Sequence, residues 1–442
     1  MSGQATTISG ALMTAQHYID MLPVDEGYWL TEQRFAAIDR LFDLGLPHAR
    51  QEAWRYTSVT GLLEQGFITT DEPGDIPEAE VQQHFLADQV AARLIFVDGL
   101  FQPALSDLQI EGVQLGNLRS AMAQGDQTVL QAVGSLSGAG EHGFSALNLA
   151  TLQDGAMIRV MADCKLETPI ELLHITSKAA AGRSLRPRHL IILEKNAGAT
   201  LVERYLALDE VSYFNNLVCE IVLQEGSSLK HQRVQQESLQ AYHLTELYLG
   251  LQADSHYQGV NVALGGQWSR TTVNNRFAAP GAICELDGLY LAGDGQLVDF
   301  HLDVDHAVPG CESRENFKGI LNGRGRAVFD GRILVREQAQ QSNAHLSNAN
   351  LMLSRQAEID TKPQLEILAD DVQCSHGATV GQLDPQAMFY LRSRGLNEDQ
   401  ARRLLCLGFA QEILDRFELE SLREQLQETI HQRLEAAVSD PI

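Results

Sequence analysis

The chain has 442 residues, of which 44% are hydrophobic and 21% charged, an ordinary balance for a water-soluble globular protein of roughly two or three structural units. Acidic residues outnumber basic ones 58 to 33, and the resulting net charge of −25 repels nucleic-acid phosphates and anionic lipid. Nucleic acid and membrane are therefore excluded as general partners.

The start of the chain shows no targeting signal. Residues 1–22 lack the basic start and continuous apolar run of a signal peptide, and no run reaches the roughly 20 apolar residues of a transmembrane helix. The six cysteines lie far apart without a C-x-x-C pair, which fits free thiols in a reducing compartment better than disulfides or zinc ligands. We expect a cytoplasmic protein.

The first region, residues 1–145, is expected to be mostly helical. Thr31 is positioned to cap a helix whose apolar face extends to Phe42. Residues 115–133 have a helical pattern as well. The glycine- and serine-rich stretch 134–143 then predicts a boundary.

The middle region, residues 146–388, has short alternating strands instead of helical periodicity. Small turn-forming residues recur at steps of 28, 27, 28 and 29 residues, at Gly198, Gly226, Ala253, Gly281 and Gly310. A near-constant step of this size favours stacked coils, each needing neighbours to bury its apolar face. We predict a mainly β fold with a parallel β-helix core; an antiparallel meander remains the alternative.

The C-terminal region, residues 389–442, is predicted to be helical, with Asn397 as an N-cap. Apolar residues recur there in two stripes, one formed by Leu404, Leu405, Phe409, Ile413 and Phe417 and the other by Leu422, Leu426, Ile430 and Leu434. Such a helix either packs on its own domain, which is the default, or docks in the groove of a partner.

Cys374 and His376 are the residues best suited to chemistry. Being two apart, they would face the same side of a strand, and thiol and imidazole both suit iron. Asp370 and Asp371 precede them and could orient the imidazole or add oxygen ligands. One thiol and one imidazole are nevertheless only half of a metal site, and a buried cysteine is more often a small hydrophobe.

A second polar cluster also contains residue types that can bind metal. It comprises His301, Asp303, Asp305, His306, Cys311, Ser313, Arg314 and Glu315. The alternating residues look like a metal site, but a solvated strand face is favoured. Residues 323–326 (GRGR) lack the G-K-[ST] ending of a phosphate-binding loop, so we expect no nucleotide to be bound by this chain.

Five segments of the chain have the pattern of a known protein family. They are residues 325–331 (GRAVFDG), 360–367 (DTKPQLEI), 369–381 (ADDVQCSHGATVG) and 389–396 (FYLRSRGL), and the shorter residues 54–57 (WRYT). Together they resemble the SufB/SufD family of iron–sulfur cluster assembly scaffolds. Within it the chain is similar to the SufD branch, because SufB chains are somewhat longer and carry a cysteine-rich motif that is missing here.

The resemblance implies a right-handed parallel β-helix in a non-catalytic scaffold that pairs with SufB and binds the SufC ATPase. His376, with Cys374 beside it, would face SufB, where a transient iron–sulfur cluster or iron forms. Neither residue should hold metal well in the isolated chain. The C-terminal region would bind SufC, with contacts from Leu404, Phe409, Ile413, Leu422, Leu426 and Ile430.

Two other functions stay open on the sequence alone. A β-helix polysaccharide lyase or hydrolase could use Asp303, Asp305 and Glu315 along a groove, although no secretion signal is found and aromatic residues are few. A homodimeric scaffold is the other alternative, because an exposed β-helix edge can pair with itself.

Overall fold

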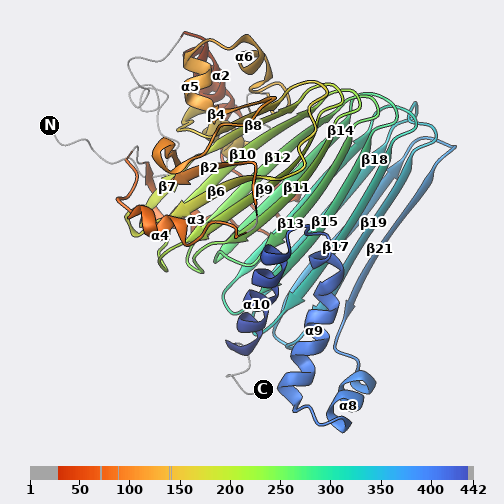
Figure 1. Ribbon diagram of the computed structural model, residues 1–442. Coiled ribbons are helices and arrows are strands. Elements are labelled where there is room, and N and C mark those ends of the chain that lie inside the picture. Colours follow the sequence, from red (N-terminus) through yellow and green to blue (C-terminus); the bar gives the residue numbers. More distant parts are fainter. Residues whose placement is uncertain (1–27, 70–71, 88, 139, 141, 437–442) are drawn as a thin grey trace.

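The computed structural model describes residues 28–436, except 70–71, 88, 139 and 141. These residues form a parallel β-helix of two sheets, with helices in the N- and C-terminal parts of the chain (Figure 1). The predicted mainly β class is confirmed. Residues 1–22, which bear on the expected location, lie outside the described residues, and no described helix is long and apolar enough to cross a membrane.

Each coil of the β-helix contributes one strand to each sheet. The 11-stranded sheet contains β1 (Ile68–Thr69), β4 (Val113–Asn117), β5 (Ala156–Val160), β7 (Arg183–Leu185), β8 (Arg188–Leu193), β10 (Phe214–Leu223), β12 (Tyr242–Leu251), β14 (Trp268–Phe277), β16 (Leu297–His306), β18 (Arg326–Val335) and β20 (Glu358–Ile367). The 10-stranded sheet contains β2 (Ala92–Val97), β3 (Leu100–Phe101), β6 (Ile170–Thr176), β9 (Gly198–Ala207), β11 (Ser228–Gln236), β13 (His256–Ala263), β15 (Ile283–Ala292), β17 (Glu312–Leu321), β19 (Asn343–Met352) and β21 (Gln373–Gly381).

The expected coils are present at the expected spacing. Gly198 pairs with Ser228, Ser228 with His256, His256 with Ile283, and Ile283 with Glu312, all in parallel register. The antiparallel pairs among the described strands are β2–β3 and β4–β5, at the first coils. The near-constant repeat therefore reports stacked coils and not a meander.

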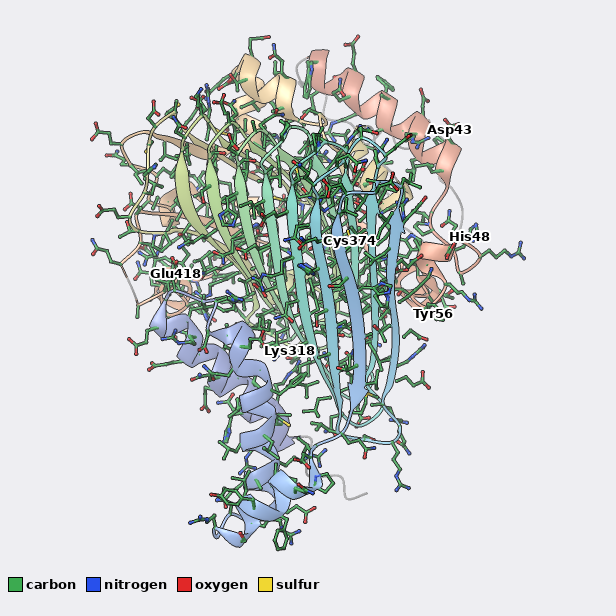
Figure 2. All side chains as sticks on the ribbon, turned by 90° about the vertical axis from the view of Figure 1, so that its right-hand side faces the viewer. Asp43, His48, Tyr56, Lys318, Cys374 and Glu418 are labelled. Carbon is green, nitrogen blue, oxygen red and sulfur yellow. The ribbon has the colours of Figure 1, made fainter. Side chains whose placement is uncertain are left out.

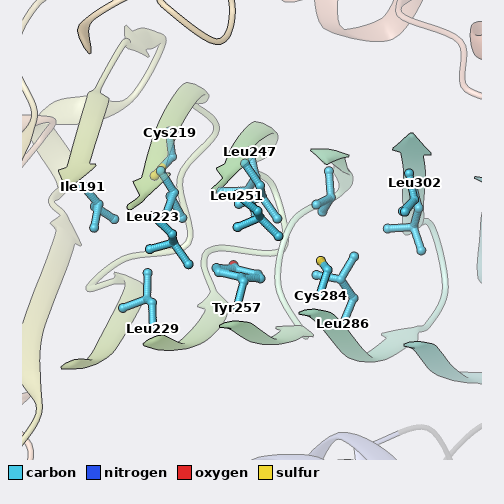
Figure 3. Close-up of a cluster of buried hydrophobic side chains, with 14 of the residues drawn as sticks. Ile191, Cys219, Leu223, Leu229, Leu247, Leu251, Tyr257, Cys284, Leu286 and Leu302 are labelled. Carbon is cyan, nitrogen blue, oxygen red and sulfur yellow. The ribbon is translucent and has the colours of Figure 1, made fainter. Parts of the chain in front are cut away.

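Apolar side chains from both sheets meet inside the coils and form the main core (Figure 3). The ring of Phe317 lies 5.2 Å from those of Phe300 and Phe329, so aromatic side chains stack from coil to coil. Gly288 leaves room for this stack, because a Cβ there would come within 2.2 Å of Phe317 Cδ1. Close packing of this kind fixes the register of neighbouring coils.

The N-terminal part mixes helices and strands. Its helices are α2 (Tyr28–Leu44), α3 (Thr60–Gln65), α4 (Glu78–Gln82), α5 (Leu118–Ala123), α6 (Gln127–Ala132) and α7 (Gly143–Ala150), with short 3₁₀ turns at Glu52–Trp54 and Pro103–Leu105. One expectation is wrong here and another holds in part. Thr31 lies inside α2 instead of capping it. The stretch predicted to be helix at 115–133 begins in strand β4, and α5 and α6 then form most of the rest. Tertiary pairing with β5 overrides the local helical pattern of that segment.

The C-terminal part forms α8 (Pro385–Ser393), α9 (Glu398–Leu414) and α10 (Glu420–Ala436). The side chain of Asn397 caps α9 by accepting a hydrogen bond from the Gln400 amide, as predicted. α9 and α10 cover the outer face of the 10-stranded sheet, where their apolar stripes meet residues such as Val260 and Leu289 (Figure 1). Packing on the chain's own domain is therefore what these two helices do.

Candidate functional site

The last coil, formed by β20 and β21, leaves one end of the β-helix open. Each of these strands pairs with only one neighbour, β18 or β19, so its other edge is unpaired among the described residues (Figure 2). Val380 is 53% exposed and Ile367 and Leu368 are exposed as well, although β-helix interiors are normally covered by further coils. The open end thus combines free backbone hydrogen-bonding groups with apolar side chains, which is the composition of an interface.

Cys374 and His376 both lie on β21, in the row that faces the interior of the coil. Their register partners on β19 are Ala344 and Leu346, which are buried core residues. Cys374 is half-buried and packs against the main core, while His376 is exposed. The structure therefore places the predicted thiol and imidazole on one side of one strand, at the uncovered end of the β-helix.

The chemistry of this pair is incomplete within the chain. Burial raises the pKa of the Cys374 thiol, so the protonated form, which is a poor ligand, is favoured. Asp371 lies in the preceding turn, where its N–H donates to Gln340 Oε1 at 2.9 Å. Among the described residues no three or more His, Cys, Asp or Glu side chains gather into a group that could hold a metal.

The second predicted cluster, His301 to Glu315, is divided between the two faces of the coils. On the outside, Asp303 pairs with Arg332 at 3.1 Å and Asp305 with Arg336 at 2.8 Å. On the inside, Glu315 is fully buried. The favoured interpretation, a solvated strand face, holds for the outward residues only, and the three carboxylates that a lyase would need do not share a groove.

The interior members of that cluster form a small polar group within the apolar core. His306 Nε2 lies 3.0 Å from the Ser313 hydroxyl, and Cys311 is buried nearby in the same core. Burial lowers the pKa of His306 to about 4, so its imidazole is neutral. The alternation of polar residues in the sequence gave no sign that part of the cluster faces inward.

The six C-terminal residues predicted to contact a partner separate into buried and accessible ones. Ile413, Leu422, Leu426 and Ile430 are buried against the outer face of the β-helix, in agreement with the default prediction that these helices pack on the chain's own domain. Phe409 is partly buried in the same cluster. Leu404, in contrast, is 50% exposed.

Two further exposed aromatic residues on α8 were missed as site candidates. Phe389 is 75% exposed and Tyr390 is 56% exposed, and α8 has no buried residue. The sequence signal that could have found them is an aromatic pair in a segment without helical apolar periodicity. α8, together with Leu404 on α9, therefore keeps an apolar surface in solvent.

The N-terminal segment at 54–57 fixes this part of the chain to the β-helix. The ring of Trp54 lies 3.9 Å from the Arg270 guanidinium carbon, and the Arg270 side chain donates to the Ala53 carbonyl at 2.8 Å. The Thr57 hydroxyl donates to the buried carboxylate of Asp299. These contacts explain the motif as a structural anchor on the 11-stranded sheet.

Comparison with known proteins gives matches over most of the chain. A model described as "SUF system FeS cluster assembly, SufBD core domain" matches residues 174–409, and one described as "SufBD protein N-terminal region" matches residues 16–172. An iron–sulfur cluster assembly SufBD family protein of Synechocystis is 33% identical to this chain over 411 residues. The match covers 91% of this chain and 90% of the length of the Synechocystis protein. The iron–sulfur cluster assembly protein SufD of Escherichia coli is 31% identical to this chain over 434 residues. The match covers 96% of this chain and 97% of the length of the Escherichia coli protein.

Proposed function

Because the chain belongs to the SufBD family of iron–sulfur cluster assembly proteins, we propose that it is a non-catalytic, SufD-type scaffold subunit of a cytoplasmic SUF complex. The observation that carries this proposal is the open last coil with Cys374 and His376 in its inward row. A scaffold of this kind holds iron or a nascent cluster as cargo at a subunit seam.

The open coil supports SufB as the partner at this seam. The unpaired edges of β20 and β21 can be covered by a second β-helix, which would also bury Val380 and Leu368. A second copy of this chain could occupy the same edge when SufB is missing. The SufB–SufD pair is preferred because the described residues of this chain bring one thiol and one imidazole to the open coil, and a different partner can complete the set of ligands.

The role of His376 and Cys374 follows from that incompleteness. A neutral imidazole and a thiolate are good ligands for iron, and SufB would supply the remaining donors. The raised pKa of the Cys374 thiol means that metal or a partner's positive charge must help to release its proton. His376 is exposed and is therefore the better placed of the two to reach across the seam.

α8 is the proposed contact surface for the SufC ATPase. Its exposed Phe389 and Tyr390 lie in the same region as the exposed Leu404, and aromatic residues are typical anchors of interfaces. Only residues 382–384 separate α8 from β21, so movement of the bound ATPase would be transmitted directly to the strand that carries His376. SufC would supply the nucleotide chemistry, and this chain would bind none.

The test is assembly of the complex with SufB and SufC from co-expressed subunits. His376→Ala should retain both partners but lower the iron and sulfide recovered after anaerobic reconstitution several-fold. His345→Ala is the matched control, because His345 is exposed on the adjacent strand but faces outward and contacts Ser375. Unchanged iron and sulfide in His376→Ala would contradict the proposed site.

The seam is tested separately with Val380→Asp, which places a charge on the exposed inward row of β21. This variant should lose SufB in size-exclusion chromatography while its own thermal unfolding is unchanged. Retention of SufB at wild-type affinity would argue against the open coil as the seam. Loss of the iron and sulfide without loss of SufB would instead place Val380 at the cargo.

A further inference from the structure

Glu315 lies inside the β-helix in the same inward row as His376. Its register partner on β19 is Leu346, and the register partner of Leu346 on β21 is His376. Neighbouring strands are about 4.8 Å apart, so the backbones of Glu315 and His376 are separated by roughly 10 Å. Leu346 stands between the two side chains, and Leu286 lies on the other side of Glu315.

The Glu315 carboxyl has no charged partner in this interior. Its side chain is fully buried, and neither oxygen makes a hydrogen bond of normal geometry among the described residues. The Ser313 hydroxyl on the same face is the polar group that favours its ionised form, but that hydroxyl also lies 3.0 Å from His306 Nε2. An ionised carboxylate held in this way would be costly.

The other titratable groups around Glu315 do not offset that cost. Cys284 lies in the same inward row of β15, opposite Ser313, and burial raises the pKa of this thiol well above its usual value, so it stays neutral. His306 on β16 is neutral because burial lowers its pKa to about 4. Arg314 favours ionisation, but its side chain pairs with Glu285 on the outer face. On β19, Ala344 and Leu346 in the inward row are apolar, and the next inward residue, Asn348, is an uncharged amide that bonds to Tyr290.

Burial therefore raises the pKa of Glu315 to about 8, and the group is mostly protonated at neutral pH. A carboxylic acid whose polar contact is a hydroxyl shared with His306 stabilises the core less than a leucine would. Its position is informative because it is two strands away from the open end formed by the last coil, where Cys374 and His376 lie. A positive charge bound at that end would act on Glu315 through a medium of low dielectric constant.

We infer that Glu315 compensates the charge of a divalent cation at Cys374 and His376: it releases its proton to solvent when the cation binds and takes a proton back when the cation leaves. This inference rests on the proposed function. The step is balanced, since one O–H bond of the carboxylic acid breaks, the electron pair stays on the carboxylate, and one proton enters the solvent. Glu315 is a positioning residue in this scheme, because Leu346 keeps it out of contact with the cation.

The test uses the complex with SufB and anaerobic Co²⁺ as the probe. Calorimetric titrations in two buffers with different ionisation heats give both the affinity and the number of protons released. The wild type should release more protons than Glu315→Gln near pH 7, and its affinity should exceed that of the variant by roughly tenfold near pH 8.5. Glu312→Gln is the control, because Glu312 is exposed on the same strand.

The outcomes separate the inference from the proposed function. Equal affinity and equal proton release in wild type and Glu315→Gln overturn the inference, while Co²⁺ binding that depends on His376 leaves the proposed function intact. Co²⁺ binding that does not depend on Cys374 and His376 overturns both. Infrared spectroscopy of the wild type needs no variant: a buried carboxylic acid band should disappear when Co²⁺ binds, and a band that persists overturns the inference.

Discussion

The middle of the β-helix and its last coil have the same alternating strands but opposite surroundings. All ten residues of β12 (Tyr242–Leu251) are buried, whereas every residue of β21 is exposed except the half-buried Cys374. β12 has a parallel neighbour on each side and the N-terminal region packed on its outer face, while β21 pairs with β19 alone among the strands that the structure describes. The comparison shows that a neighbour, more than the local sequence, decides whether a row of side chains becomes core or interface.

Ion pairs differ between the two regions in the same way. Arg188 and Glu220 pair at 2.8 Å with side chains only 1% exposed, and Arg188 also donates to Asn148. Near the open end, Arg332 pairs with Asp303 and Glu366 at 3.1 and 3.0 Å while remaining 39% exposed. The buried Arg188–Glu220 pair is part of the folded core. The ion pairs of Arg332 lie on a solvated surface, where they contribute little to the free energy of unfolding.

The largest expected loss of stability therefore comes from breaking the buried Arg188–Glu220 pair. Arg188→Ala leaves the carboxylate of Glu220 buried without its partner, so the free energy of unfolding should fall by about 3–5 kcal/mol. Arg332→Ala should change it by less than about 1 kcal/mol, because solvent screens that pair. Urea denaturation followed by circular dichroism measures both, and similar values for the two variants would remove the contrast between the regions.

The C-terminal helices repeat the contrast on a smaller scale. Ile430 on α10 is fully buried against the β-helix, so Ile430→Ala should cost about 2–4 kcal/mol and weaken SufC binding only through loss of structure. Phe389 on α8 is exposed, so Phe389→Ala should leave stability within about 0.5 kcal/mol. Pull-down with SufC at a temperature where both variants are folded separates these effects: SufC retained by Phe389→Ala would exclude α8 as the contact surface.

The sequence predicted the coils because their repeat is carried by turn residues, which act locally. It also predicted that Cys374 and His376 face one side, since strand alternation fixes this. For Ile430 it offered packing on the chain's own domain only as the default, because an apolar stripe looks the same whether it meets its own sheet or another chain. It failed for Glu315, because periodicity alone cannot say which face of a strand looks into the coil when both faces carry polar residues.

Glu315 supplies the smallest and most specific test of the comparison, since it is a polar residue that is buried close to the open end. Its pKa is raised to about 8 in the folded chain and is near 4.5 in the unfolded chain. Between these values the folded state holds more protons than the unfolded state, so the free energy of unfolding of the wild type falls as pH rises from about 4.5 to about 8. Glu315→Gln cannot ionise and loses this slope.

The free energy of unfolding of Glu315→Gln should therefore rise relative to that of the wild type between about pH 4.5 and about pH 8. Above pH 8 the difference should level off. We expect a gain of about 1–3 kcal/mol at pH 8.5, because water reaching the open end reduces the cost of the charge. Urea denaturation at pH 5 and 8.5 measures the gain, with Glu312→Gln as the exposed control. If the gain in the free energy of unfolding were the same at both pH values, the carboxyl of Glu315 would already be ionised at pH 5. The interior of the last coils would then be as accessible to water as their outer surface.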